Sequence, residues 1–249
     1  MNKSTAKAAA LALAVMLSPA IAEAAEVTLL ISNAVKTVLE DLAPQFEKAI
    51  AHKLLITYGS TNPLKARIEK GEAFDMTILG EAAIDDLVKQ GRLVATTRTV
   101  VARSGLGVAI RKGAAKPDIG STEAFKRTLL NAKSIAYLVD GLTGTYLKVL
   151  FQRLGIADSI QAKYKNARGA EAVAAGEVEL GVTQISEILF QTGTELVGPL
   201  PPEIQNYTHF LSAVSAGAKQ ADAGRALIKY FASPDAVRVM RANGLEPAN

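Results

Sequence analysis

Three short segments place hydroxyl and amide side chains where a predicted strand gives way to a predicted helix. They are the segment from Ser32 to Thr37, which begins Ser32-Asn33-Ala34, and the segments Ser60-Thr61-Asn62 and Thr143-Gly144-Thr145. Side chains of this kind cap helices, and the free N–H groups at a helix start also bind anions. Capping alone would explain any one of these segments. Because all three follow the carboxyl ends of predicted parallel strands, together they indicate a site where neutral donors hold a small anion.

Two further side chains are candidate ligand contacts. Arg168 opens a predicted helix, and its guanidinium is suited to a carboxylate or an oxyanion, although a solvated first-turn arginine is an equally good interpretation. Gln184 follows a buried strand at the same predicted sheet edge. We interpret Asp75 as a structural cap of neighbouring backbone, and Tyr58 and Tyr146 as packed aromatic residues rather than ligand donors.

Motifs for enzymatic chemistry are weak. The segment GLTGT lacks the G-x-S-x-G of a nucleophile elbow, and GLGVAI lacks the third glycine of a dinucleotide fingerprint. His52 and His209 are the only histidines and cysteine is absent, which leaves little for a metal centre or a Ser–His triad. We therefore predict no catalytic residue, no metal and no cofactor. An exported lyase or isomerase is the alternative, with Asp140 or Glu187 as its general base.

The first residues have the features of a secretory signal peptide. Lys3 and Lys7 precede a short apolar stretch, and Ala22-Glu23-Ala24 is the best cleavage site, ahead of Ala20-Ile21-Ala22. We expect residues 1–24 to be removed and the rest to be a soluble periplasmic protein. Without cysteine there is no lipid anchor, and the cores must form without disulfides.

The net charge of the chain limits the classes of ligand and partner that it is suited to bind. The formal net charge is +4, of which one unit leaves with the predicted signal peptide. This mild excess suits an anionic ligand and is far below the clustered charge of a nucleic-acid binder. We therefore expect no nucleic-acid partner.

Strand and helix patterns alternate along the chain, which is typical of parallel α/β sheets. The segment VVARSGLGVAIRKG indicates two strands separated by a crossing at 103–105, and a second crossing is expected at 206–209. We predict one lobe from residues 25–103 and 208–249, a second from 104–207, and a ligand cleft between them. Predicted strands lie at 27–31, 54–58, 74–79, 134–139, 162–164 and 180–183, with an extended run at 208–215. Predicted helices lie at 34–50, 63–70, 82–90, 122–131, 144–154, 168–175, 220–231 and 234–242.

Four segments, EVTLLISNAVKTVLEDLAPQFEKA, YGSTNPLKARIEKGEAFDMTIL, GTYLKVLFQRLG and GEVELGV, resemble the periplasmic molybdate-binding proteins of ABC importers. The similarity covers nearly the whole mature chain in the same order. It implies the two-lobed type II periplasmic binding protein fold, with a mainly parallel sheet flanked by helices in each lobe and a two-stranded hinge. It also implies a monomer that closes around molybdate or tungstate and delivers it to an inner-membrane ABC permease, without a cofactor.

The resemblance also assigns ligand-contacting positions. Family members hold their oxyanion with hydroxyls, backbone N–H groups and one tyrosine. By position, the two serines fall on Ala34 and on Thr61 beside Ser60, the backbone donors fall near Thr143 and Ala167, and the tyrosine falls on Gln184. These changes leave a small organic carboxylate, such as citrate or aconitate, as an alternative ligand that Arg168 would suit. A periplasmic sensor partner is an alternative to a transport role.

Overall fold

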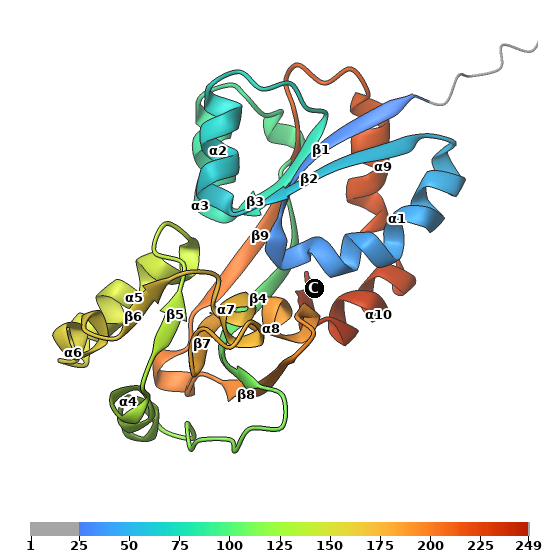
Figure 1. The fold of residues 1–249 in the computed structure, drawn as a ribbon. Coiled ribbons are helices and arrows are strands. Elements are labelled where there is room, and N and C mark those ends of the chain that lie inside the picture. Colours follow the sequence, from blue (N-terminus) through green and yellow to red (C-terminus); the bar gives the residue numbers. More distant parts are fainter. Residues whose placement is uncertain (1–24, 249) are drawn as a thin grey trace, which may run out of the picture.

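The strands of this computed structural model, which describes residues 25–248, form one continuous mixed sheet through two lobes (Figure 1). The predicted signal peptide lies outside the described residues. The strands are β1 (Glu26–Ser32), β2 (Lys53–Gly59), β3 (Met76–Gly80), β4 (Thr99–Arg111), β5 (Ile135–Tyr137), β6 (Tyr164–Asn166), β7 (Leu180–Gln184), β8 (Thr194–Pro199), β9 (Tyr207–Val214) and β10 (Glu246–Pro247). Their order is β2-β1-β3-β9-β4-β7-β5-β6, and β8 and β10 also pair with β4.

Helices cover both faces of the sheet in each lobe (Figure 1). They are η1 (Asn33–Val35), α1 (Lys36–Ile50), α2 (Thr61–Glu69), α3 (Glu81–Lys89), η2 (Ala95–Thr97), α4 (Thr122–Asn131), α5 (Leu142–Arg153), α6 (Ala157–Gln161), α7 (Gly169–Ala174), α8 (Ile185–Phe190), η3 (Pro202–Ile204), α9 (Ala221–Tyr230) and α10 (Pro234–Ala242). Among the described residues, no helix is long and apolar enough to cross a membrane.

Strand β1 shows why the first lobe has helices on both sides. Leu29 and Ile31 pack with α1, α9 and α10, whereas Leu30 packs with Leu64 of α2 and Ile84 of α3. Successive side chains of a strand point to opposite faces, so a continuous apolar run predicts a strand buried on both. Its parallel pairing with β2 and β3 brings the carboxyl ends of all three strands to one edge, where the first ligand segments lie.

The second lobe places the remaining ligand segments at an equivalent edge. Strands β6 and β7 run parallel to β5, and their helices follow directly. Gly181 of β7 lies against the backbone of Gly169 in α7, where a Cβ on Gly181 would come 2.4 Å from the Gly169 carbonyl oxygen. This close packing holds the start of α7, and with it Arg168, at the end of the sheet.

The two predicted strands around residues 103–105 are in fact one strand, so that prediction was wrong. Strand β4 pairs with β9 as far as Gly105 and with β7 from Leu106 onward. Because the partner changes between two adjacent residues, an unbroken strand passes from one lobe to the other without a turn. Other differences are small shifts at element ends, together with the unpredicted elements η2, α6, α8, β8, η3 and β10, which are too short or too irregular for periodicity to reveal.

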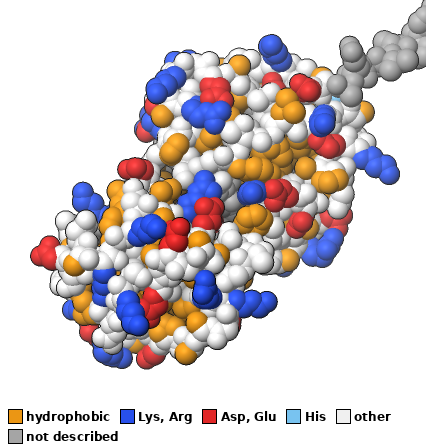
Figure 2. All heavy atoms as spheres, viewed as in Figure 1, with side chains coloured by type: hydrophobic (Ala, Val, Ile, Leu, Met, Phe, Trp, Pro, Cys, Tyr) orange, Lys and Arg blue, Asp and Glu red, His pale blue; other side chains and the backbone are white. Residues whose placement is uncertain are grey.

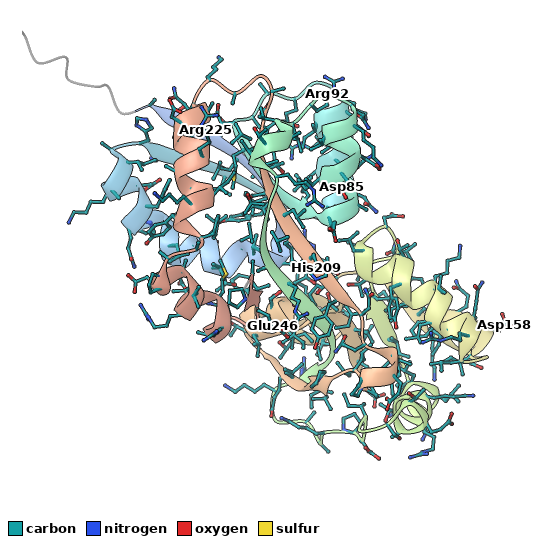
Figure 3. The ribbon with its side chains drawn as sticks, turned by 180° about the vertical axis from the view of Figure 1, so that it is seen from behind. Asp85, Arg92, Asp158, His209, Arg225 and Glu246 are labelled. Carbon is teal, nitrogen blue, oxygen red and sulfur yellow. The ribbon has the colours of Figure 1, made fainter. Side chains whose placement is uncertain are left out.

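Side chains fasten the two strands that connect the lobes. Gln205 accepts from the Leu106 N–H at 2.8 Å and donates to the Leu106 carbonyl at 3.0 Å. On the back of the molecule, His209 of β9 lies near Glu246 of β10 (Figure 3), and Arg103 of β4 forms an ion pair with Glu246. The Gln205 bonds hold β4 to the segment that leads into β9, and the Arg103–Glu246 pair holds β4 to β10. Both lie beside the crossing that the sequence predicts near residues 206–209, where β4 and β9 pair directly.

Asp75 has the structural role that the sequence predicts. Its buried carboxylate accepts from the Thr28 N–H at 2.8 Å and from the N–H groups of Lys219 and Gln220, also at 2.8 Å. The side chain therefore ties β1 to the start of α9.

We expect Asp75→Asn to lower the free energy of unfolding by about 2 kcal/mol. Both carboxylate oxygens of Asp75 accept from backbone N–H groups, so the NH2 group of asparagine would replace one acceptor and face an N–H group that it cannot bind. Denaturant unfolding would measure the loss. Asp158→Asn, at an exposed carboxyl of α6, is the control. Equal unfolding curves for the two variants would contradict this role for Asp75.

Candidate functional site

A small cavity of about 50 Å³ lies where the two lobes meet. We call it the inner cavity. Both lobes build its wall from side chains at the ends of strands and the starts of helices. The lining residues are Ser32, Ala34, Ser60, Thr61 and Phe210 from the first lobe, and Leu138, Gly141, Leu142, Thr143, Arg168, Thr183, Gln184 and Glu187 from the second.

The first lobe contributes hydroxyl groups. Ser60 begins α2 without a capping hydrogen bond from its side chain, which leaves its hydroxyl for the cavity. Thr61 accepts from the Gly80 N–H at 3.2 Å through Oγ1, so its own proton is available to donate. Ser32 accepts from the Ala34 N–H at 3.4 Å. These groups provide neutral hydrogen bonds but no positive charge.

The second lobe contributes Thr143, buried in the first turn of α5, and Gln184, which ends β7. The Gln184 Nε2 donates to Thr208 Oγ1 at 2.9 Å, and its buried Oε1 has no partner among the described residues. Turning the amide by 180° would let Thr208 donate to Oε1 and would free Nε2 as a donor. Gln184 can therefore present a donor to an anion, as a tyrosine hydroxyl would.

Arg168 and Glu187 bring charge to the same cavity. Burial raises the pKa of the Glu187 carboxyl above its ordinary range, while the Thr183 hydroxyl that donates to it and the Arg168 charge act in the opposite direction. Arg168 itself is exposed and forms an ion pair with Glu171 at 2.8 Å. A carboxyl that keeps its proton more readily can donate a hydrogen bond to an anion or exchange a proton with it.

The lobes touch at the rim of the inner cavity. Asn62 of α2 donates to the Asp140 carbonyl at 2.7 Å across the cleft. Leu142 of α5 packs against Gly80, where an added Cβ would lie 2.5 Å from its Cδ1. The two lobes are therefore in contact beside the cavity, and each lobe supplies part of its wall.

Several residues that the sequence singles out lie elsewhere. Asn33 lines a neighbouring cavity, and Asn62 bridges the lobes. Neither Gly144 nor Thr145 lines the inner cavity, and the Thr145 hydroxyl donates to the Gly141 carbonyl at 3.1 Å. Ala167 is also outside it, and its N–H donates to the Lys165 carbonyl at 3.0 Å.

The structure also adds residues that the ligand predictions lack. Thr183 and Phe210 line the inner cavity, and of the two suggested general bases only Glu187 does, since Asp140 is exposed and contributes its carbonyl to the lobe contact. Thr183 lies on β7 and Glu187 on α8, so the strand-to-helix turn brings the two together and no periodic pattern in the sequence signals the pair. Among residues 25–248, no cluster of three or more His, Asp or Glu is arranged to hold a metal ion.

The sequence model of the bacterial extracellular solute-binding proteins matches residues 27–246. This chain belongs to that family. Aconitate isomerase of a Pseudomonas species is 34% identical to this solute-binding protein over 229 residues, covering 88% of this chain and 87% of the relative. The molybdate-binding protein ModA of Azotobacter vinelandii is 26% identical over 235 residues, with 90% of each chain covered.

A solved structure supports the fold. The periplasmic molybdate-binding protein of Azotobacter vinelandii superposes on this solute-binding protein with a TM-score of 0.73 at 21% identity, covering 90% of this chain and 100% of the other. The predicted two-lobed α/β fold and the resemblance to molybdate-binding proteins are thereby confirmed at the level of fold and family.

Proposed function

We propose that this solute-binding protein captures a small anion in the inner cavity and presents it, in the closed form, to an ABC permease. One observation carries the proposal: hydroxyls beside helix starts of both lobes line a single cavity at which the lobes touch. A ligand held by both walls would favour the closed form, because it binds that form better than the open one. The lobes would move as residues 25–103 with 208–249 against residues 104–207, in the periplasm, after removal of residues 1–24.

Molybdate or tungstate is the first candidate ligand, bound without chemical turnover. The relatives named for molybdate support it, as do the neutral donors and the small volume of the inner cavity. Helix starts and hydroxyls hold a dehydrated oxyanion without a full counter-charge. In this proposal Ser60, Thr61 and Thr143 donate to its oxygens, and Gln184 donates through a turned amide.

An organic carboxylate is the second candidate, and two observations favour it. Arg168 is a guanidinium on the cavity wall, the geometry that suits carboxylates. The relative with 34% identity is named for aconitate, and it is named as an isomerase. Moving a double bond in such an acid requires a group that takes a proton from one carbon and returns one to another, and Glu187 is the cavity group that could do so.

Thermal unfolding with a panel of anions tests the proposal. We expect at least one of molybdate, tungstate, sulfate, phosphate, citrate or aconitate to raise the melting temperature, since a ligand at about 100 times its Kd adds about 2.7 kcal/mol. Thr61→Val should remove most of that rise, and Thr128→Val, on α4 in the second lobe, should keep it. No change with any anion would contradict anion capture.

A further inference from the structure

A second cavity of about 50 Å³ lies beside the inner one, and the two share Arg168 and Glu187 as lining residues. We call it the outer cavity. It is lined by Asn33 and Lys36 from the first lobe and by Arg168, Glu171, Phe190 and Gln191 from the second, among others. We propose, building on anion capture in the inner cavity, that the outer cavity holds a second anionic group, so that the ligand is a short organic di- or tricarboxylate.

The outer cavity has a cation from each lobe. Lys36 begins α1, and its Nζ lies 4.8 Å from the ring centre of Phe190 in the opposite lobe and 5.6 Å from that of Tyr58. Aromatic faces attract a cation without satisfying its hydrogen bonds. The nearest carboxylate oxygen to Lys36 is that of Glu40, at 3.7 Å, so the ammonium can still donate to a ligand.

Arg168 stands between the two cavities. Its Nη1 pairs with Glu171 at 2.8 Å, and both side chains are about half exposed, at 46% and 56%. An exposed pair of this kind contributes little and exchanges readily. Arg168 can therefore donate from some of its N–H groups to a ligand carboxylate while it stays between the inner and outer cavities. Figure 2 shows basic and acidic side chains gathered round the hollow between the lobes.

The charges of the outer cavity favour an anion as long as Glu187 keeps its proton. Lys36 and Arg168 are positive, Glu171 is negative, and burial holds the Glu187 carboxyl toward its neutral form. The side chains that line the outer cavity then sum to one positive charge, and Glu40, which lies outside the lining at 3.7 Å from Lys36, offsets part of it. A neutral Glu187 also offers an O–H to a carboxylate, which an ionised one cannot do.

The two volumes support a ligand larger than a tetrahedral oxyanion. At about 50 Å³ each, the cavities have room for roughly three to five water-sized groups apiece. A tetrahedral oxyanion or one carboxylate with its carbon fills the inner cavity and leaves the outer one to water. A short tricarboxylate is more than twice as large, and its separate carboxylates can reach both.

Calorimetric titration with tricarballylate, propionate and molybdate tests the second subsite. Tricarballylate is a saturated tricarboxylate, so isomerisation cannot obscure its binding. We expect Lys36→Met to weaken tricarballylate binding roughly 10-fold or more, the scale of a lost hydrogen bond to a charged group. The binding of propionate or molybdate should change less than about 3-fold, because neither reaches the outer cavity. Lys229→Met removes the same charge from the exposed surface of α9 and should leave all three affinities unchanged.

The outcomes separate this inference from the proposed function. Binding of molybdate or propionate without tricarballylate would overturn the second subsite and leave anion capture intact. An equal loss for every anion in Lys36→Met would also overturn it. That result would mean that Lys36 attracts all anions at long range and does not contact a second carboxylate. Absence of binding by all three anions, together with the panel above, would overturn both.

Discussion

Gly144→Ala is expected to lower the melting temperature by roughly 5 to 10 °C and to weaken anion binding at least about 10-fold. A Cβ at this position would lie 2.3 Å from the Leu138 carbonyl oxygen and 2.5 Å from that of Val139. Both contacts are with backbone, so no side-chain rotation relieves them. The helix start must separate from the segment before it, at a cost of about 2 to 3 kcal/mol.

The loss of binding follows from what the displaced segments carry. Leu138 precedes α5 and Thr143 lies in its first turn, and both line the inner cavity. Helices ordinarily prefer Ala to Gly by about 1 kcal/mol, so without the clash this change would stabilise the protein. A lower melting temperature would therefore mean that the backbone clash outweighs the helix propensity of alanine, and a higher one would mean the reverse.

Gly217→Ala is the matched control, because among the described residues, apart from its chain neighbours, only the Ser215 hydroxyl oxygen comes within 4 Å of its added Cβ, at 4.0 Å. Calorimetric unfolding and titration with a bound anion would measure both variants. If Gly144→Ala melted at or above the temperature of the parent, the close approach of α5 to the preceding segment would be contradicted.

Patterns local in sequence were sufficient to predict most of the fold. Leu29, Leu30 and Ile31 form a continuous apolar run, which predicts a strand buried on both faces, and the structure gives each face its own helices. The junctions after β1 and β2 were predictable for the same reason, since capping residues mark them. The unbroken course of β4 was not, because a change of partner strand between Gly105 and Leu106 leaves no turn signal.

The candidate site was only partly predictable, because pairing between distant segments brings its charges together. Arg168 and Glu187 meet on the inner cavity since β7 pairs with β5 and α7 packs against β7 at Gly181. Glu187 lies on a six-residue helix, too short to show a periodic pattern. A capping pattern also cannot tell Ser60, which faces the cavity, from Thr145, whose hydroxyl serves its own helix.

Glu187→Gln is expected to remove a pH dependence of stability that the parent has above about pH 4.3. Burial raises the pKa of this carboxyl in the folded protein above its value in the unfolded chain. Below the unfolded value both states hold the proton and the parent has its full stability. As the pH rises toward the folded pKa, the unfolded chain releases the proton first, so stability falls. The parent should therefore lose stability relative to the variant from about pH 4.3, the ordinary pKa of glutamate, up to the folded pKa.

The same Glu187→Gln variant also tests whether Glu187 transfers a proton to or from a bound ligand. The amide has nearly the same shape but cannot exchange a proton at the carboxyl oxygen, so any isomerisation of aconitate should fall by about 100-fold or more while anion binding stays within about 10-fold. Denaturant unfolding from pH 4 to 8 and an absorbance assay with cis-aconitate would measure the two effects. Glu203→Gln changes an exposed acid on η3 and is the control. Parallel stability curves for parent and variant would contradict the raised pKa of Glu187. Aconitate turnover that survives the substitution would exclude Glu187 as the proton-transfer group.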